Sequence, residues 1–132
     1  MAAGFVIRTL VPESSIFDLA YPSTTNLSGK SYLFAVDNGT EIAVAGAGDA
    51  TLGVLQDGFD GSVRTNVATV RTCGLTKILL GDDVSAMTFV KSDTNGAAVA
   101  AGNKDSSEGY VLDGGLSGEI VVMVIQHSPT IA

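Results

Sequence analysis

The sequence has little of what most catalytic and metal sites require. It contains one cysteine, one histidine and no tryptophan in 132 residues. A single cysteine excludes a disulfide within the chain and a cage of thiolates, and a single histidine excludes most histidine-rich metal sites. We therefore expect no catalytic residues, no cofactor and no metal, and we expect that the protein is not an enzyme.

Positive charge is also scarce. Seven Lys and Arg residues stand against 14 Asp and Glu residues, which gives a net charge of -7. Binding to nucleic acid requires clustered Lys and Arg opposite the phosphates, and an anionic membrane surface attracts the same residues. The composition therefore predicts that neither nucleic acid nor membrane is a partner.

Long apolar runs are missing as well. The longest uninterrupted run, Ile120 to Ile125, is far shorter than the roughly 20 residues of a membrane-spanning helix. The first residues lack the basic stretch and apolar run of a secretory signal. We expect a soluble protein that stays in a reducing compartment.

Short β-strands separated by turns account for most of the sequence. Tyr32, Phe34 and Val36 alternate with smaller residues, and Asn38-Gly39 and Asn95-Gly96 each lie between apolar runs, which is the strongest short signal of a hairpin. Further strands are expected at residues 42–45, 52–56, 63–73, 75–80, 87–91, 97–100, 110–112 and 119–126. The pattern predicts an all-β fold, a small glycine-rich β-barrel or β-sandwich, with at most one or two short helices within 82–87 or 14–21.

The N-terminal segment differs from the rest. A short extended run over residues 4–11 ends at Pro12, and residues 13–29 are rich in Ser, Thr, Pro and Asn but still carry five large apolar side chains. Either this segment is an arm that is buried on another molecule, or it covers the open end of its own barrel. We divide the chain into an extended N-terminal arm, 1–29, and a single β domain, 30–132.

The last strand lacks the polar alternation of a half-buried strand. A strand that is apolar on both faces is either covered on both sides or faces a partner. A barrel this small covers few strands on both faces, so we predict a subunit interface that includes Ile120, Val122 and Val124.

Two parts of the chain share a layout. Residues 47–63 and 101–120 each contain a tight turn, a strand that starts at glycine (Gly53 or Gly109), a glycine-rich loop and a longer strand. The echo predicts two similar β units packed together.

The motifs that suggest chemistry fail on inspection. The segment around Asp93-Thr94-Asn95-Gly96 matches the middle of a calcium loop, but Lys91 and Gly102 occupy positions that require carboxylates. No nucleophile elbow accompanies His127 or Cys73. We interpret the first motif as a hairpin turn, and the other two as strand residues.

Several weak motifs in a fixed order resemble one protein family. They are Ala47-Gly48-Asp49, Gly53-Val54-Leu55, Gly81-Asp82-Asp83-Val84, Ser92-Asp93-Thr94-Asn95-Gly96-Ala97-Ala98-Val99, Gly109-Tyr110-Val111-Leu112 and Gly118-Glu119-Ile120-Val121-Val122-Met123-Val124. Their order and spacing, from residue 47 onward, resemble the cement or head-decoration proteins of bacteriophage capsids. The first 46 residues and a polar segment at 103–108 depart from that pattern.

The resemblance implies a structural virion protein on the outer surface of the capsid, assembled in the host cytoplasm. Such proteins are usually trimers that bind the major capsid protein at local three-fold positions and stabilise the expanded head. Phe5, Ile7 and Arg8 are then candidates for capsid binding, although Phe5 and Ile7 fit an ordinary strand equally well. The alternatives are another non-enzymatic β module, such as a tail, fibre or adhesin domain, and a small ligand-binding barrel.

Overall fold

The structure is a computed structural model of the chain, and it describes residues 16–23, 26–39, 41–57, 66–102 and 106–128. These residues form nine β-strands and no helix, which confirms the all-β prediction. Residues 82–87 form turns and a bridge, and the described part of 14–21 lies mostly in a strand. The strands are β1 (Phe17–Ser23), β2 (Phe34–Asp37), β3 (Ile42–Val44), β4 (Gly53–Leu55), β5 (Asn66–Leu79), β6 (Phe89–Ser92), β7 (Ala98–Ala100), β8 (Ser107–Val111) and β9 (Ile120–Ser128).

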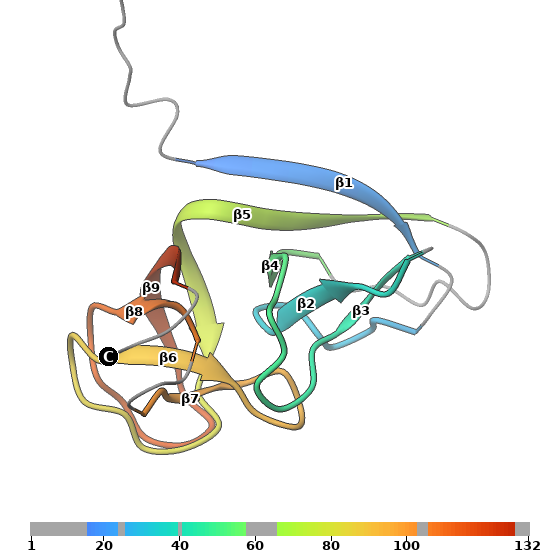
Figure 1. The fold of residues 1–132 in the computed structure, drawn as a ribbon. Helices are drawn as coiled ribbons and strands as arrows, with labels where there is room; N and C mark the ends of the chain where they lie inside the picture. Colours follow the sequence, from blue (N-terminus) through green and yellow to red (C-terminus); the bar gives the residue numbers. More distant parts are fainter. Residues whose placement is uncertain (1–15, 24–25, 40, 58–65, 103–105, 129–132) are drawn as a thin grey trace, which may run out of the picture.

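The strands form one curled antiparallel sheet in the order β3-β2-β4-β5-β9-β8-β6-β7, and β1 also pairs with β5 (Figure 1). The β2–β3 and β6–β7 hairpins lie where the two Asn-Gly pairs predict them. At the second turn, Gly96 has a φ of +80°, and the Asp93 carboxylate accepts hydrogen bonds from the N–H groups of Asn95 and Ala97 at 2.8 and 2.9 Å. The motif that resembles a calcium loop is therefore a hairpin turn.

Strand β5 is bent and serves two parts of the sheet. The sequence predicts two strands, at 63–73 and 75–80, whereas the structure has one strand of 14 residues. Gly74 has a φ of +96°, which glycine adopts without strain. At this bend the partner on one edge of β5 changes, because Cys73 pairs with β1 and Gly74 pairs with β9. In Figure 1, β5 runs beside β1 and then turns down beside β9.

The bend divides the sheet into two units with the same topology. Unit 1 consists of β1 to β4 and residues 66–73 of β5, in the order β1-β5-β4-β2-β3, and unit 2 consists of residues 74–79 of β5 and β6 to β9, in the order β5-β9-β8-β6-β7. The last strand of unit 1 is thus continuous with the first strand of unit 2. The shared layout of residues 47–63 and 101–120 in the sequence reflects this internal repeat.

The two glycines that open β4 and β8 are equivalent in the repeat. Gly53 pairs with Ala35, and Gly109 pairs with Val90. A Cβ atom at Gly53 would lie 2.0 Å from the carbonyl oxygen of Arg71, and one at Gly109 would lie 2.0 Å from that of Val124. Both positions therefore require glycine, because the neighbouring strand leaves no room for a side chain.

The structure shifts one part of the predicted alignment. Ala45 and Ala101 donate equivalent backbone hydrogen bonds to the first residues of β2 and β6, so Ala45-Gly46 is the equivalent of Ala101-Gly102. The sequence alone predicts Ala47-Gly48 as the equivalent of Ala101-Gly102, and this prediction is wrong by two residues. With the shifted alignment, residues 103–108 correspond to residues 47–52, so this segment has the same length in both units.

The repeat extends to backbone strain. Tyr32 and Met87 are the two non-glycine residues with positive φ among the described residues, at +67° and +60°. Their N–H groups donate to the carbonyls of Leu55 and Val111, which are equivalent positions at the ends of β4 and β8. The same unusual turn therefore precedes β2 and β6.

Two clusters of buried side chains stabilise the sheet. The smaller lies within unit 1 and includes Leu27, Ile42, Leu55 and Val70. The larger lies mainly within unit 2 but also contains three side chains from unit 1. Its members are Phe34, Ala45, Val54, Ile78, Leu80, Val84, Val90, Ala98, Val111, Met123 and Ile125.

Candidate interaction surface

Strand β9 has one buried face and one partly exposed face. Met123 and Ile125 are buried, and Val121 packs against the same core. Ile120 on the opposite face is 51% exposed, and Val122 and Val124 are half-buried. The structure thus places the three predicted interface residues together, on the side of β9 that points away from the core.

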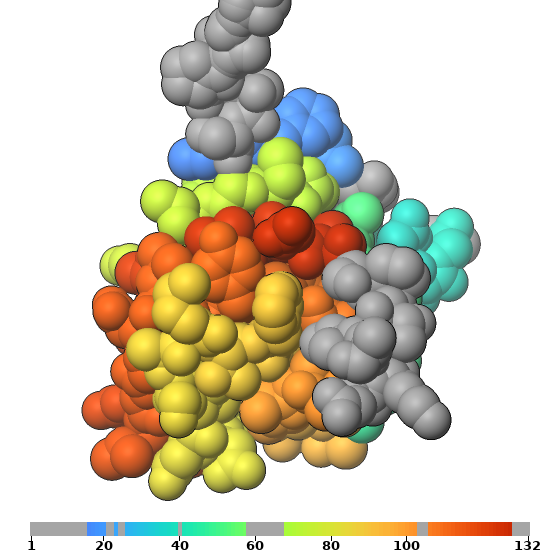
Figure 2. Space-filling model, turned by 60° about the vertical axis from the view of Figure 1, so that its left-hand side comes forward, coloured from blue at the N-terminus to red at the C-terminus, as the bar shows by residue number. Residues whose placement is uncertain are grey.

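Neighbouring strands extend this apolar surface. Leu75 on β5 and Tyr110 on β8 both pair with Val124, and Phe89 on β6 pairs with Tyr110. The rings of Phe89 and Tyr110 meet edge to face with centroids 5.7 Å apart. We define the outer face by its six apolar side chains: Leu75, Phe89, Tyr110, Ile120, Val122 and Val124. Figure 2 shows the yellow segment that includes β6 beside the orange and red segments that include β8 and β9.

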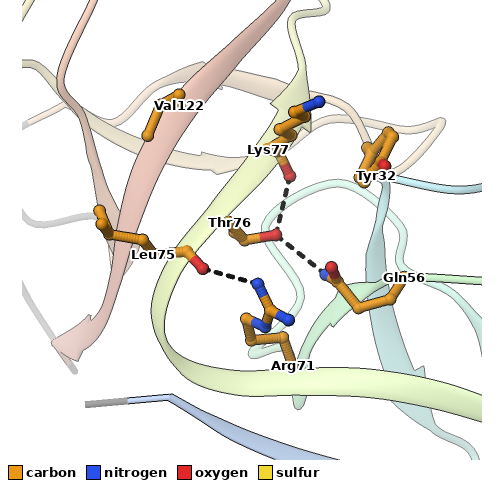
Figure 3. Close-up of a pocket in the computed structure, with 7 residues that line it drawn as sticks. All are labelled: Tyr32, Gln56, Arg71, Leu75, Thr76, Lys77 and Val122. Atoms are coloured by element: carbon orange, nitrogen blue, oxygen red, sulfur yellow. Dashed lines mark hydrogen bonds between the residues drawn. The ribbon is translucent and has the colours of Figure 1, made fainter. Parts of the chain in front are cut away.

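A hollow of about 280 Å³ lies at the bend of β5, where the two units meet (Figure 3). Within it, the Gln56 side chain donates to the Thr76 hydroxyl at 2.9 Å. It is lined by Tyr32, Gln56, Arg71, Leu75, Thr76, Lys77 and Val122. Because Leu75 and Val122 belong to both surfaces, the hollow is continuous with the outer face.

Two cationic side chains line this hollow. Arg71 forms a bidentate ion pair with Asp18 at 2.8 and 3.2 Å, and the hydrogen bond to that carboxylate raises the pKa of Arg71. The Lys77 ammonium lies 5.9 Å from the centre of the Tyr32 ring, a cation–π contact. Because the Asp18 carboxylate offsets the charge of Arg71, the positive charge of the hollow comes mainly from Lys77, on a strongly acidic chain.

A buried carboxylate, that of Glu108, links the two units. Glu108 Oε1 accepts hydrogen bonds from the Thr51 N–H at 3.1 Å, from the Thr51 hydroxyl at 2.6 Å and from His127 Nδ1 at 3.0 Å. The sequence places Glu108 in a polar segment, and no motif there predicts this role. Glu108 lies at the start of β8, and His127, the chain's one histidine, lies at the end of β9. Only the register of these two strands brings the two residues together, and a motif search along the sequence does not show it.

The network shifts both pKa values. Burial by itself raises the pKa of Glu108, but the hydrogen bonds from His127 and Thr51 outweigh it, so the pKa is lowered. The hydrogen bond with Glu108 raises the pKa of His127 against a smaller opposing effect of burial. The pair is therefore charged over a range of mildly acidic pH. Through Thr51, the pair joins the residue that precedes β4 by two positions to β8 and β9.

The other sequence-predicted positions fall outside a site. Phe5, Ile7 and Arg8 lie outside the described residues. Asp82 and Asp83 are exposed and bond to backbone N–H groups of Asp83 and Ser117. Within the described ranges no three His, Cys, Asp or Glu residues are grouped to hold a metal, and no helix is long and apolar enough to cross a bilayer.

Comparison with known proteins gives a match in structure. No family model and no curated protein matches the sequence. Among solved structures, the head fiber gp8.5 N base of bacteriophage phi29 superposes with a TM-score of 0.67, over 89% of this chain and 98% of that chain, at 15% identity. The two chains share a fold. The neighbour is a protein of a phage head, the setting that the sequence resemblance implies, whereas membership of the decoration family remains a prediction.

Proposed function

We propose that this chain is a structural virion protein that binds the outside of a phage capsid and stabilises the expanded head. The observation that carries the proposal is the shared fold with a phage head fiber base over nearly all of that chain. The sequence resemblance to capsid decoration proteins supports the same setting. The outer face supports a role in adhesion, because large apolar side chains gather there on an otherwise acidic protein.

The protein acts as a trimer at local three-fold positions of the capsid. The outer face, which includes Ile120, Val122 and Val124, supplies the contact between copies, and burial of apolar surface contributes about 25 cal/mol per Å² before the entropy of association is subtracted. Phe5, Ile7 and Arg8 contact the major capsid protein. Many identical contacts around one shell then add to a large total reinforcement.

The proposal is tested with heads that lack the protein. Expanded heads are prepared from phage in which the gene has been deleted, and purified protein is added in increasing amounts. We expect saturable binding to the outer surface, seen by cosedimentation and cryo-electron microscopy, and an increase in the temperature at which the heads rupture. The triple variant Phe5→Ala, Ile7→Ala, Arg8→Ala is expected to keep its solution mass and lose binding. Failure of the unaltered protein to bind would refute the proposal.

A second candidate is the base of a fibre. The solved neighbour is the base of a head fiber, which favours this alternative over the other fibre and adhesin modules. In that case the protein binds the head without changing its rupture temperature, and its deletion removes a projecting fibre from the particle. The heat measurement and the images of the deleted phage distinguish the two functions.

A further inference from the structure

We infer that the outer face binds unit 1 of a second copy of this chain, in a head-to-tail contact. The inference rests on the proposed function for its setting, because it specifies how copies of the proposed trimer meet. The evidence comes from the internal repeat.

The repeat allows the two aromatic residues of the outer face, on β6 and β8, to be compared with their equivalents in unit 1. Phe89 and Tyr110 pair across β6 and β8 as Phe34 and Val54 pair across β2 and β4. Phe34 is 1% exposed and Val54 is fully buried, whereas Phe89 is 42% exposed and Tyr110 is partly exposed. At the β2 and β4 positions the face is therefore covered in unit 1, whereas the equivalent positions on β6 and β8 are open in unit 2. Asp18 and Arg71, the equivalents of Leu75 and Val124, stay at least partly exposed.

Unit 2 covers the face of unit 1 that carries Phe34 and Val54. Phe34, Ala45 and Val54 belong to the buried cluster whose other members come from β5 and from unit 2. Backbone hydrogen bonds fix the contact, since the Phe34 N–H donates to the Gly96 carbonyl at 2.7 Å and the Gly48 N–H donates to the Ser92 carbonyl at 2.9 Å. This unit thus has a surface that accepts a neighbouring unit of its own fold.

A second copy supplies the unit that the outer face lacks. The described part of one chain contains two units, and its unit 2 already covers unit 1. Charge is compatible with a second copy as the occupant, because Lys77 lies beside the outer face while the chain is acidic overall and its unit 1 exposes Asp37, Asp49 and Asp57. A partner's unit 1 therefore brings carboxylates to the cationic end of the face.

Such a contact joins two different surfaces. In a pair joined this way, one copy keeps a free outer face and the other keeps a free docking surface on unit 1, so the contact repeats until the copies close into a ring or extend as an open filament. A ring of three copies meets the three-fold symmetry of the proposed capsid position without a second type of contact. Two outer faces packed against each other would instead give a closed dimer.

The contact is tested by photo-crosslinking. Phe89 is replaced by the photoreactive analogue benzoylphenylalanine, and unlabelled variant is mixed with ¹⁵N-labelled unaltered protein, so that only crosslinks between copies join the two isotopes. We expect crosslinked labelled peptides from residues 16–57 of the partner. Crosslinks to residues 75–124 of the partner would show face-to-face packing and overturn the inference, as would no crosslink between copies.

A pair of exposed-residue variants gives an independent measurement. Phe89→Glu is compared with Leu116→Glu, whose side chain is 61% exposed in the turn before β9 and outside the outer face. We expect Phe89→Glu to raise the dissociation constant of the oligomer at least about tenfold and Leu116→Glu to leave it within about twofold. Thermal unfolding verifies that both variants fold, and equal effects of the two would overturn the inference.

The outcome separates this inference from the proposed function. If the unaltered protein binds deleted heads but shows no head-to-tail crosslink, the inference is wrong and the proposed function stands. If the crosslink forms but heads are not bound, the contact stands and the proposed function is wrong.

Discussion

Replacement of Glu108 by glutamine is expected to destabilise the protein most at mildly acidic pH. The carboxylate accepts three hydrogen bonds at one oxygen, two from Thr51 and one from His127. A hydrogen bond to a charged group contributes about 1.5–3 kcal/mol and a neutral one about 0.5–1.5 kcal/mol, so each bond loses about 1 kcal/mol when the acceptor becomes an amide. Because Thr51 and His127 are partly exposed and regain water, we expect a total loss of about 2 kcal/mol.

The pH dependence follows from the directions of the two pKa shifts. The pKa of His127 is raised, so its contribution to stability is present below its ordinary value of 6.5 and is lost as pH rises through the raised value. The pKa of Glu108 is lowered, so its contribution is present above its ordinary value of 4.5 and is lost as pH falls through the lowered value. Both contributions are fully present between pH 4.5 and pH 6.5, the ordinary pKa values of the two groups. Glu108→Gln therefore loses more free energy of unfolding at pH 5.5 than at pH 8.5.

Urea unfolding of both proteins at pH 5.5 and pH 8.5 measures this difference. Glu119→Gln is the matched control, since Glu119 also accepts a backbone hydrogen bond, from Leu116 at 2.8 Å, but is exposed. We expect the control to change stability by less than about 0.5 kcal/mol at either pH. A loss in Glu108→Gln that is the same at both pH values, or no larger than in the control, would refute the reasoning.

Three further predictions concern the glycines of the repeat, the β6–β7 turn and the ion pair between Asp18 and Arg71. Gly53→Ala and Gly109→Ala should each lower the free energy of unfolding by about 3 kcal/mol or more, because the added Cβ meets a backbone oxygen at 2.0 Å. Gly118→Ala should lower it by only about 1 kcal/mol, because Gly118 has positive φ but no atom within 4 Å of the added Cβ. Equal shifts in Tm for the three variants would contradict this. Asp93→Ala should lower the free energy of unfolding, measured by thermal unfolding, by about 1–2 kcal/mol, because two hydrogen bonds at the β6–β7 turn are lost. Asp82→Ala removes one local hydrogen bond and should lower it by less. Asp18→Asn should cost less than about 1 kcal/mol in urea unfolding, and less still in 1 M salt, because the ion pair with Arg71 is partly exposed; a loss above about 2 kcal/mol would contradict this.

Local patterns in the sequence predict the strands and hairpins but not how the sheet is divided. Asn38-Gly39 and Asn95-Gly96 predict their turns because the positive φ that each turn needs, +107° and +80°, is supplied by the glycine of the pair itself. Gly74 predicts a break in the chain, yet β5 continues through it because β1 and β9 pair end to end along one edge. Such pairing depends on residues about 50 positions away, and no local pattern carries it.

The interface prediction illustrates the same limit. The unbroken apolar run of β9 predicts that a second face needs a partner, and period-two alternation selects Ile120, Val122 and Val124 as that face. Phe89, Tyr110 and Leu75 join them only through the register of three strands. Glu108 was missed for a related reason, because its burial and its bond to His127 follow from the pairing of β8 with β9 and not from the polar residues that precede it.

The sharing of β5 has a consequence for biosynthesis. All strands of unit 1 leave the ribosome before residue 80, whereas the partner of Leu79 is Ile120, 41 residues later. At about 5–20 residues per second, the far half of β5 waits for about 2–8 s with an unpaired edge. During that interval the nascent chain exposes a template for wrong strand pairing, which makes translation speed over unit 2 a determinant of yield.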